Sequence, residues 1–487
     1  MKFRTGVQFA VLAAVCALGG TVGQLGCSAI LGLEDTTLRG GNGPLLVQVT
    51  QGWFAADGGY TKTFPTGSAT DPLRALDPNS VDVLVWADGK FLGPFYTTTS
   101  TPDGLLFDAL PAGERYVRIA DPSNGTSTYV AHGHRLDVGT DTFGRPDPVL
   151  ASEPMILQII GTNVSDAGSS NDQLGGTISK SLYGDDAGRS PWTTPFYQND
   201  PLLDLSRGDV AWVARDTPDP DAHHFETCRF PDGYRMQDQQ NSVNVTCSTI
   251  LFKQHLSVNV LGSDFARAAH ANGETDPLRA WLRVGPGTGK LDWWVDQVAS
   301  SSLPRPETQT WDVDFVNPAP TTWPVSVSIL LLASRSDSLG DGGVTSGFTS
   351  NGATSVVSGA SATVGPVLGA LSGVTVGGKD VLYNGFVSGL GPEPIVVTLT
   401  PAPPSADLAL LAPTHYEIAV LDAKSATVAD IRSSRPEVAL PPGVVEKGKQ
   451  YSLLVTASYS SQYSEEEPRR GAASASSVAT TTNSFTP

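Results

Sequence analysis

The chain has 487 residues, of which only 16% are charged, and it is rich in glycine (51) and proline (36). A length of about three ordinary domains, with a composition typical of short strands joined by turns, predicts an all-β chain with Ser- and Gly-rich spacers between domains. The formal net charge of −18 argues against nucleic acid as a partner and against electrostatic adhesion to anionic lipid.

Residues 1–26 have the pattern of a secretory signal peptide. A basic start with Lys2 and Arg4 precedes an apolar run from Val7 to Leu18. This run is too short to span a bilayer, so it indicates export rather than a membrane-spanning segment. No later apolar run reaches spanning length.

A cysteine, Cys27, follows the apolar run directly after the small residue Gly26. This arrangement resembles a bacterial lipobox, although Gln24 stands where that pattern has leucine and the leucine comes one place later, at Leu25. The resemblance implies a lipid on the Cys27 thiol, a tether over residues 27–43 and a location in the cell envelope. Contact with a membrane would then run only through the lipid.

The residue after this cysteine favours the outer membrane as the location. Ser28 differs from the aspartate that is associated with retention at the inner membrane. The alternative is ordinary signal cleavage near Cys27, which would leave the protein secreted or periplasmic.

Residues 44–155 are predicted to form a first β-sandwich module. The run from Val81 to Val85 alternates, and Asp88-Gly89 follows as the turn of a hairpin, in which both turn residues need a positive φ. Further on, Leu110-Pro-Ala-Gly113 leads into a strand that contains Tyr116. This segment resembles transthyretin-like bacterial surface modules, and the resemblance implies a β-sandwich.

Residues 156–335 are predicted to form a second β-sandwich module. Several of its runs place apolar side chains on one strand face and polar ones on the other, and no long helical period interrupts them. The alternating apolar sets are Val243, Val245 and Cys247; Leu256, Val258 and Val260; and Trp311, Val313 and Phe315.

Two cysteines of this module are expected to pair. Cys16 leaves with the signal peptide and Cys27 is the candidate anchor, so Cys228 and Cys247 remain. In an exported chain a disulfide is the default interpretation of such a pair. The alternative is two buried thiols.

Residues 336–364 are predicted to be a Gly/Ser linker, with an edge strand as an open alternative for part of it. Residues 365–460 are predicted to form the last module, because a turn delivers a tyrosine into a long strand through Val445, Gly448, Tyr451, Leu453, Val455 and Ala457. This spacing resembles the end of a fibronectin type III domain.

The resemblance implies that the ring of Tyr451 is buried and that its hydroxyl bonds backbone upstream. Lys447 replaces the proline usual at this corner, and Leu399 is the nearest candidate for the tryptophan usual in the second strand. Residues 461–487, rich in Ser, Ala and Thr, are expected to be disordered.

The sequence holds no recognisable catalytic or metal motif. A Gly-x-Ser-x-Gly elbow is absent, and Gly285–Lys290 lacks the first glycine and the hydroxyl of a phosphate loop. His132 and His134, and His223 with His224, are histidine clusters without a third ligand, whereas zinc needs at least three. We therefore expect no enzyme, no metal and no cofactor, although a triad assembled in space stays open.

The second module also holds a group of tryptophans. Trp293 and Trp294 are adjacent, so in a regular strand they point to opposite faces and one of them could stack on a sugar ring. The alternative is packing in the core, which the alternation around Trp311 supports. Five of the nine tryptophans belong to the group, namely Trp281, Trp293, Trp294, Trp311 and Trp323.

Together these patterns predict an exported all-β lipoprotein with several immunoglobulin- or fibronectin III-like sandwiches in tandem. The leading hypothesis is a structural or adhesive role, with other envelope proteins or glycans as partners. A carbohydrate-binding protein that uses the Trp-rich module is the alternative, and a hydrolase of unfamiliar type is the third. Fold resemblance alone does not choose among them.

Overall fold

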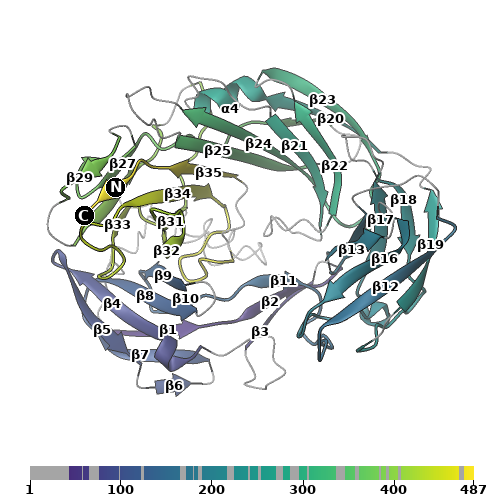
Figure 1. The fold of residues 1–487 in the computed structure, drawn as a ribbon, viewed down its shortest axis with the longest axis horizontal. Coiled ribbons are helices and arrows are strands. Elements are labelled where there is room, and N and C mark those ends of the chain that lie inside the picture. The colour runs from purple at the N-terminus through teal and green to yellow at the C-terminus, as the bar shows by residue number, and fades with distance from the viewer. Residues whose placement is uncertain are drawn as a thin grey trace, which may run out of the picture.

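The computed structural model describes residues 43–57, 59–64, 76–97, 99–101, 103–121, 125–164, 172–178, 180–184, 189–216, 224–239, 242–249, 254–269, 278–285, 296–303, 307–335, 346–356, 361–382, 385–390, 394–403, 407–470 and 476–487. Regular structure in these residues is strand, apart from the short helix α4 (Gly262–Ala268) and two 3-10 turns, η1 (Pro78–Ser80) and η2 (Leu205–Arg207). Figure 1 shows the strands arranged around a ring, with the yellow C-terminal strands close to the purple first strands. The fold is all-β with several cores, as the sequence predicts. Of the helices in the described part of the chain, none has the length and apolar character needed to cross a membrane.

The first module is a β-sandwich. Its inward valines, Val81, Val83 and Val85, are buried because alternate side chains of a strand share a face. The predicted hairpin forms, with positive φ angles of 50° at Asp88 and 74° at Gly89. One sheet has the order β10-β1-β7-β6, and across the core lie β9, β8, β4 and β5. These strands, with the small sheet β11-β2-β3, are β1 (Gly43–Gln48), β2 (Gln51–Phe54), β3 (Tyr60–Thr63), β4 (Val81–Ala87), β5 (Lys90–Tyr96), β6 (Thr99–Thr101), β7 (Gly104–Leu110), β8 (Glu114–Asp121), β9 (Gly125–Ala131), β10 (Arg135–Asp137) and β11 (Asp141–Phe143).

The second module is a single eight-stranded sheet that closes on itself. Its order is β14-β13-β17-β18-β19-β12-β16-β15, and the two end strands are separated in the chain only by Leu182. Leu182 is buried in the core that the sheet surrounds. The strands are β12 (Met155–Thr162), β13 (Gln173–Gly176), β14 (Lys180–Ser181), β15 (Tyr183–Gly184), β16 (Arg189–Phe196), β17 (Ala211–Asp216), β18 (His224–Arg229) and β19 (Ser242–Thr249).

A third core follows within residues 156–335, which the strand patterns predict to be one module. The sheet β23-β20-β26 packs against β22-β21-β24, and the alternating residues Leu256, Val258 and Val260 of β20 fill the space between them. Alternation alone does not tell which strands share a core, so the sequence did not separate this core from that of the closed sheet. The strands are β20 (Gln254–Leu261), β21 (Leu278–Val284), β22 (Asp296–Leu303), β23 (Thr308–Phe315), β24 (Val325–Arg335) and β26 (Ser361–Val364).

The last module packs the sheet β28-β27-β30-β33 against β34, β31 and β32. Tyr451 is 4% exposed, and its hydroxyl accepts a hydrogen bond of 3.0 Å from the backbone N–H of Glu446, which is the corner that the fibronectin III resemblance implies. The strands are β27 (Gly373–Val376), β28 (Lys379–Asp380), β29 (Val387–Ser388), β30 (Val396–Thr400), β31 (His415–Asp422), β32 (Thr427–Ser433), β33 (Glu437–Ala439) and β34 (Tyr451–Tyr459).

The structure differs from the sequence analysis in the segments expected to be linker and disordered tail. β25 (Ser346–Val356) pairs along its whole length with β24 and is paired on its other side by β35 (Ser476–Thr481). β36 (Phe485–Thr486) brings Phe485 into the last core, where it is fully buried. Ser, Thr, Ala and Gly look disordered by composition. Here, however, neighbouring strands on both sides satisfy the backbone hydrogen bonds of β25 and β35.

One continuous sheet joins three of the four modules. Its path is β22-β21-β24-β25-β35-β34-β31-β32-β9-β8-β4-β5, so strands of the third, last and first modules are hydrogen-bonded in series. The junction of last and first modules is the parallel pair β32 and β9, with Ile431 opposite Thr128. Beside it the Tyr116 hydroxyl accepts a 3.0 Å hydrogen bond from the N–H of Ala439. These three modules therefore form one body, and the closed sheet is attached to it because Trp212 and Ala214 of β17 are buried in the third core.

Candidate functional site

Several residues that the sequence nominates lie outside the described part of the chain. These are the candidate lipidation site Cys27, the candidate stacking residues Trp293 and Trp294, and His223. Lipid attachment and stacking on these tryptophans stay predictions.

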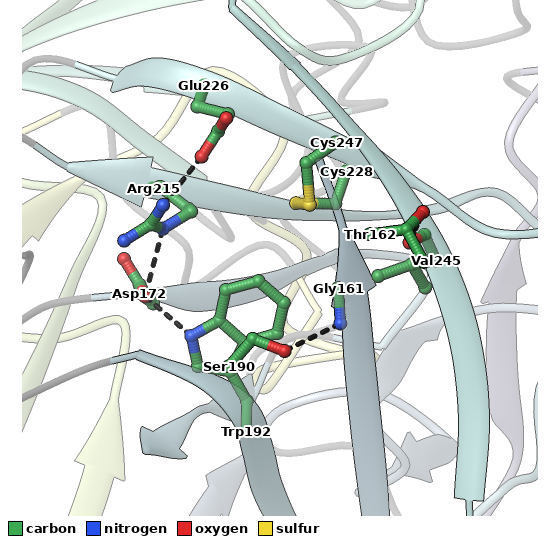
Figure 2. The surroundings of a disulfide bond; sticks show 10 residues. All are labelled: Gly161, Thr162, Asp172, Ser190, Trp192, Arg215, Glu226, Cys228, Val245 and Cys247. Atoms are coloured by element: carbon green, nitrogen blue, oxygen red, sulfur yellow. Dashed lines mark hydrogen bonds and ion pairs between the residues drawn. A yellow bond between two sulfur atoms is a disulfide. The ribbon is translucent and has the colours of Figure 1, made fainter. Parts of the chain in front are cut away.

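Cys228 and Cys247 are joined by a disulfide between the adjacent strands β18 and β19. The two residues are direct register partners, and both side chains point into the core of the closed sheet (Figure 2). Because the bond closes a loop of about 20 residues, it is expected to stabilise this module by roughly 3 kcal/mol through the unfolded chain.

A buried ion cluster lies beside the disulfide (Figure 2). Arg215 Nη1 is 2.6 Å from Glu226 Oε2, and its Nε is 3.4 Å from Asp172 Oδ2. Trp192 Nε1 donates a 2.6 Å hydrogen bond to the same aspartate oxygen. All four side chains are buried, so the cluster holds the strands in register and is sealed from any substrate. The sequence gives only a weak signal for this ion cluster. Arg215 stands two residues after the inward Val213 and therefore shares its strand face.

The described tryptophans of the Trp-rich stretch belong mainly to the core. Trp311 is 7% and Trp323 is 3% exposed. Trp323 Nε1 also donates a 2.8 Å hydrogen bond to the carbonyl of Ala56, which ties the third module to the first. Trp281 is half-buried, with the Arg283 guanidinium 5.0 Å from its ring.

His132 and His134, the histidine pair in the described part of the chain, do not converge on a metal site. His134 is exposed and its Nδ1 lies 2.9 Å from the carbonyl oxygen of Pro44. Both ring nitrogens of His132 are buried without a hydrogen-bond partner, and burial together with Arg435 lowers its pKa. Within the described ranges, no three His, Cys, Asp or Glu side chains are grouped so as to hold a metal ion.

The segment between β34 and β35 reaches back to the first module. We call residues 460–470 the clasp. Arg470 is buried at the end of the clasp, with Nη1 2.8 Å from Asp137 Oδ2 and Nε 3.0 Å from Asp141 Oδ1. It also donates to the carbonyl and the hydroxyl of Thr50. One buried cation of the clasp thus pairs with two buried carboxylates of the first module.

The clasp also rests on the last module. The ring of Tyr463 stacks on His415, with centroids 4.3 Å apart and planes 6° from parallel. Glu467 forms a 2.5 Å ion pair with Lys62 on β3. A cavity of about 60 Å³ remains beside this ion pair, and its lining charges are already paired with one another.

Burial shifts the pKa of several groups at this junction. At Asp137 burial opposes ionisation, but hydrogen bonds from Thr50 and the charge of Arg470 outweigh it and lower the pKa. At Asp141 burial prevails and raises the pKa. Burial and then Glu417 raise the pKa of Asp430 to about 6. Burial and then Arg432 lower the pKa of His415 to about 4, because both disfavour its cationic form.

One exposed face of the closed sheet is poor in charge. We call it the neutral face; it consists of the outward side chains of β15, β12 and β19 and of the C-terminal half of β16, and Arg189 at the start of β16 lies at its edge. Ile156 and Tyr183 are each 64% exposed, and Ile160 is 36% exposed. The face comprises Tyr183, Thr193, Pro195, Ile156, Gln158, Ile160, Thr162, Ser242, Asn244, Thr246 and Ser248.

Comparison with known proteins gives little further guidance. No family model matches the chain, and no curated protein matches it. Among solved structures, two B repeat units of the collagen binding protein of Staphylococcus aureus are 11% identical, covering 92% of this chain and 99% of that one, with a TM-score of 0.14. The Bacillus anthracis TIE protein is 8% identical, covering 85% of this chain and 69% of that one, with a TM-score of 0.13. At TM-scores this low, neither similarity indicates what this chain binds.

Proposed function

We propose that this chain is an exported, non-catalytic protein of the bacterial cell envelope with a structural or adhesive role. The observation that carries the proposal is the fusion of the modules into one body by the continuous sheet and the clasp. Such a body holds binding surfaces at fixed positions relative to one another.

The use of the buried charges supports a non-catalytic role. Arg215 and Arg470 are each paired with carboxylates inside the protein, where no substrate can reach them. The cavity beside the clasp, at about 60 Å³, is far below the several hundred Å³ usual for ligand pockets. The outer faces of the modules remain as the surfaces for interaction.

Attachment through a lipid on Cys27 at the outer membrane belongs to the same proposal. Cys27→Ser should then release the protein from the membrane fraction and abolish fatty-acid labelling. Unchanged fractionation, with no label on the parent protein, would refute attachment and leave the protein secreted or periplasmic. Glycan binding at Trp293 and Trp294 finds no support in the described Trp311 and Trp323, which are core residues.

The role itself is tested in cells that lack the chain and are complemented with variants. Envelope integrity and adhesion are the readouts, with the exported amount of each variant measured alongside. Arg470→Met should complement poorly because it opens the junction, whereas His255→Ala should complement fully. His255 and Asp314, 2.8 Å apart and exposed, are the pair a hydrolase could use. Full complementation by Arg470→Met and loss with His255→Ala would favour catalysis instead.

A further inference from the structure

The outer surface of the closed second module is divided into two unlike parts. On β17 the outward Trp212 and Ala214 are buried in the third core, so a neighbouring module covers that part. On β12 the outward Ile156 and Ile160 remain exposed, although both are β-branched apolar residues in the middle of the sheet. The β12 side, at the right of Figure 1, is therefore the part left uncovered.

The neutral face has an ordered pattern of side chains. Tyr183 on β15 is the register partner of Thr193 on β16, which is partner to Gln158 on β12, which is partner to Ser242 on β19. These four form one polar row across four strands, about 14 Å long at the usual strand spacing. Apolar positions flank the row on both sides along β12, with Ile156 opposite Pro195 on one side and Ile160 on the other.

We propose that the neutral face binds an uncharged polysaccharide, an inference that rests on the proposed surface-binding role and names its ligand. A sugar ring presents apolar C–H faces and a rim of hydroxyls. The exposed ring of Tyr183 and the side chain of Ile156 fit the C–H faces, and the amide of Gln158 can donate to one hydroxyl and accept from another.

Charge decides the class of polysaccharide. The chain carries a net charge of −18, so an acidic polymer is repelled and a neutral one is not. The central polar row of the face holds no basic side chain; Arg189 at the start of β16 and Arg229 on β18, the register partner of Thr246, lie at its borders. A protein partner fits less well, since protein interfaces are enriched in aromatic residues and arginine and poor in serine, whereas β19 presents Ser242, Asn244, Thr246 and Ser248.

The test is affinity electrophoresis of the mature full-length protein in gels containing soluble neutral polysaccharides (a β-glucan, an α-glucan and a galactomannan) or the acidic polymer alginate. At least one neutral polymer should retard the wild type, and alginate should not. Tyr183→Ala and Ile156→Asp should each weaken binding by about tenfold or more. Tyr96→Ala is the matched control, because Tyr96 is 63% exposed but lies on β5 of the first module, and it should bind as the wild type does.

Several outcomes would overturn the proposal. These are no retardation by any neutral polymer, retardation by alginate alone, or equal loss in Tyr96→Ala. Loss only in a Trp293→Ala, Trp294→Ala double variant would move the site to these two tryptophans. Concentration-dependent dimers in sedimentation that Ile156→Asp abolishes would assign the face to a second copy. Thermal unfolding of each variant checks its folding, and the cell adhesion assay separates failure of this site from failure of the envelope role.

Discussion

At the scale of single residues, Tyr451 fixes the corner at which the chain enters β34. The corner backbone turns at Gly448, whose φ is +80°, and the Tyr451 hydroxyl accepts from the N–H of Glu446. The ring packs 6.1 Å from that of Phe485 in the last core. The hydroxyl therefore ties a loop to the core, and its removal leaves a partly buried N–H without a partner.

Tyr451→Phe should cost about 1–3 kcal/mol, the usual scale for a hydrogen-bond partner lost from a buried group. Native-state hydrogen exchange at the β34 amides is the measurement, because it reports local stability in a chain with several cores. Lys449→Ala removes only an exposed ion pair with Glu446 and serves as the control, with exchange expected to match that of the wild type. Equal exchange in both variants would mean that the hydroxyl does not support the corner.

A second residue-scale feature is the buried His415 under the clasp. Its folded pKa of about 4 lies below the unfolded value near 6.5, so the unfolded chain binds more protons between these pH values. Its contribution to stability is therefore complete above pH 6.5 and is lost as the pH falls toward 4. Asp430, with a pKa raised to about 6, acts in the opposite direction as the pH rises through that value.

His415→Phe should separate the two effects, because it keeps a ring to stack on Tyr463 and removes the titration. Relative to this variant, the wild type should lose roughly 2–3 kcal/mol between pH 7 and pH 4.5. Unfolding midpoints measured across this range give the comparison. Parallel pH profiles for the two proteins would show that His415 is not held neutral by the junction.

At the scale of elements, the clasp joins the last module to the first. Arg470 supplies a positive charge that Asp137 and Asp141 share, and all three side chains are less than 5% exposed. In a buried site the loss of one partner costs more than the pair contributes, because the remaining charges keep their desolvation penalty.

Arg470→Met should therefore destabilise the junction by about 3–5 kcal/mol. Cleavage by a glutamyl endopeptidase at Glu465–Glu467 should become much faster, since the clasp would open more often. Lys62→Met is the matched control, because it removes a partly exposed partner of Glu467 and should change cleavage little. A cleavage rate for Arg470→Met equal to that of the control would contradict the role given to the clasp.

At the scale of the whole molecule, features coded by neighbouring residues could be predicted from the sequence. The Asp88-Gly89 hairpin, the inward face of β20 and the Tyr451 corner each depend on spacings of a few residues. Pairing of Cys228 with Cys247 followed by elimination among four cysteines. For the neutral face, the sequence shows the alternation of inward and outward residues in β19. The polar row across the face cannot be predicted, because it depends on the register of four strands.

The features that close the body could not be predicted, because their partners are remote. Arg470 and Asp137 are 333 residues apart, and Tyr116 and Ala439 are 323 apart. Nothing local to either member of such a pair indicates the other. The strands β25 and β35 were missed for a related reason, since their small residues gain order only from strands supplied by other parts of the chain.

Small-angle X-ray scattering of the mature protein tests the central claim, that the modules form one closed body, most directly. A compact chain of 487 residues has a radius of gyration of about 23 Å. The expected result is a value within a few ångström of this, with a single maximum in the pair-distance distribution. An elongated distribution with a radius of gyration above about 35 Å, as for modules strung on linkers, would contradict the closed body.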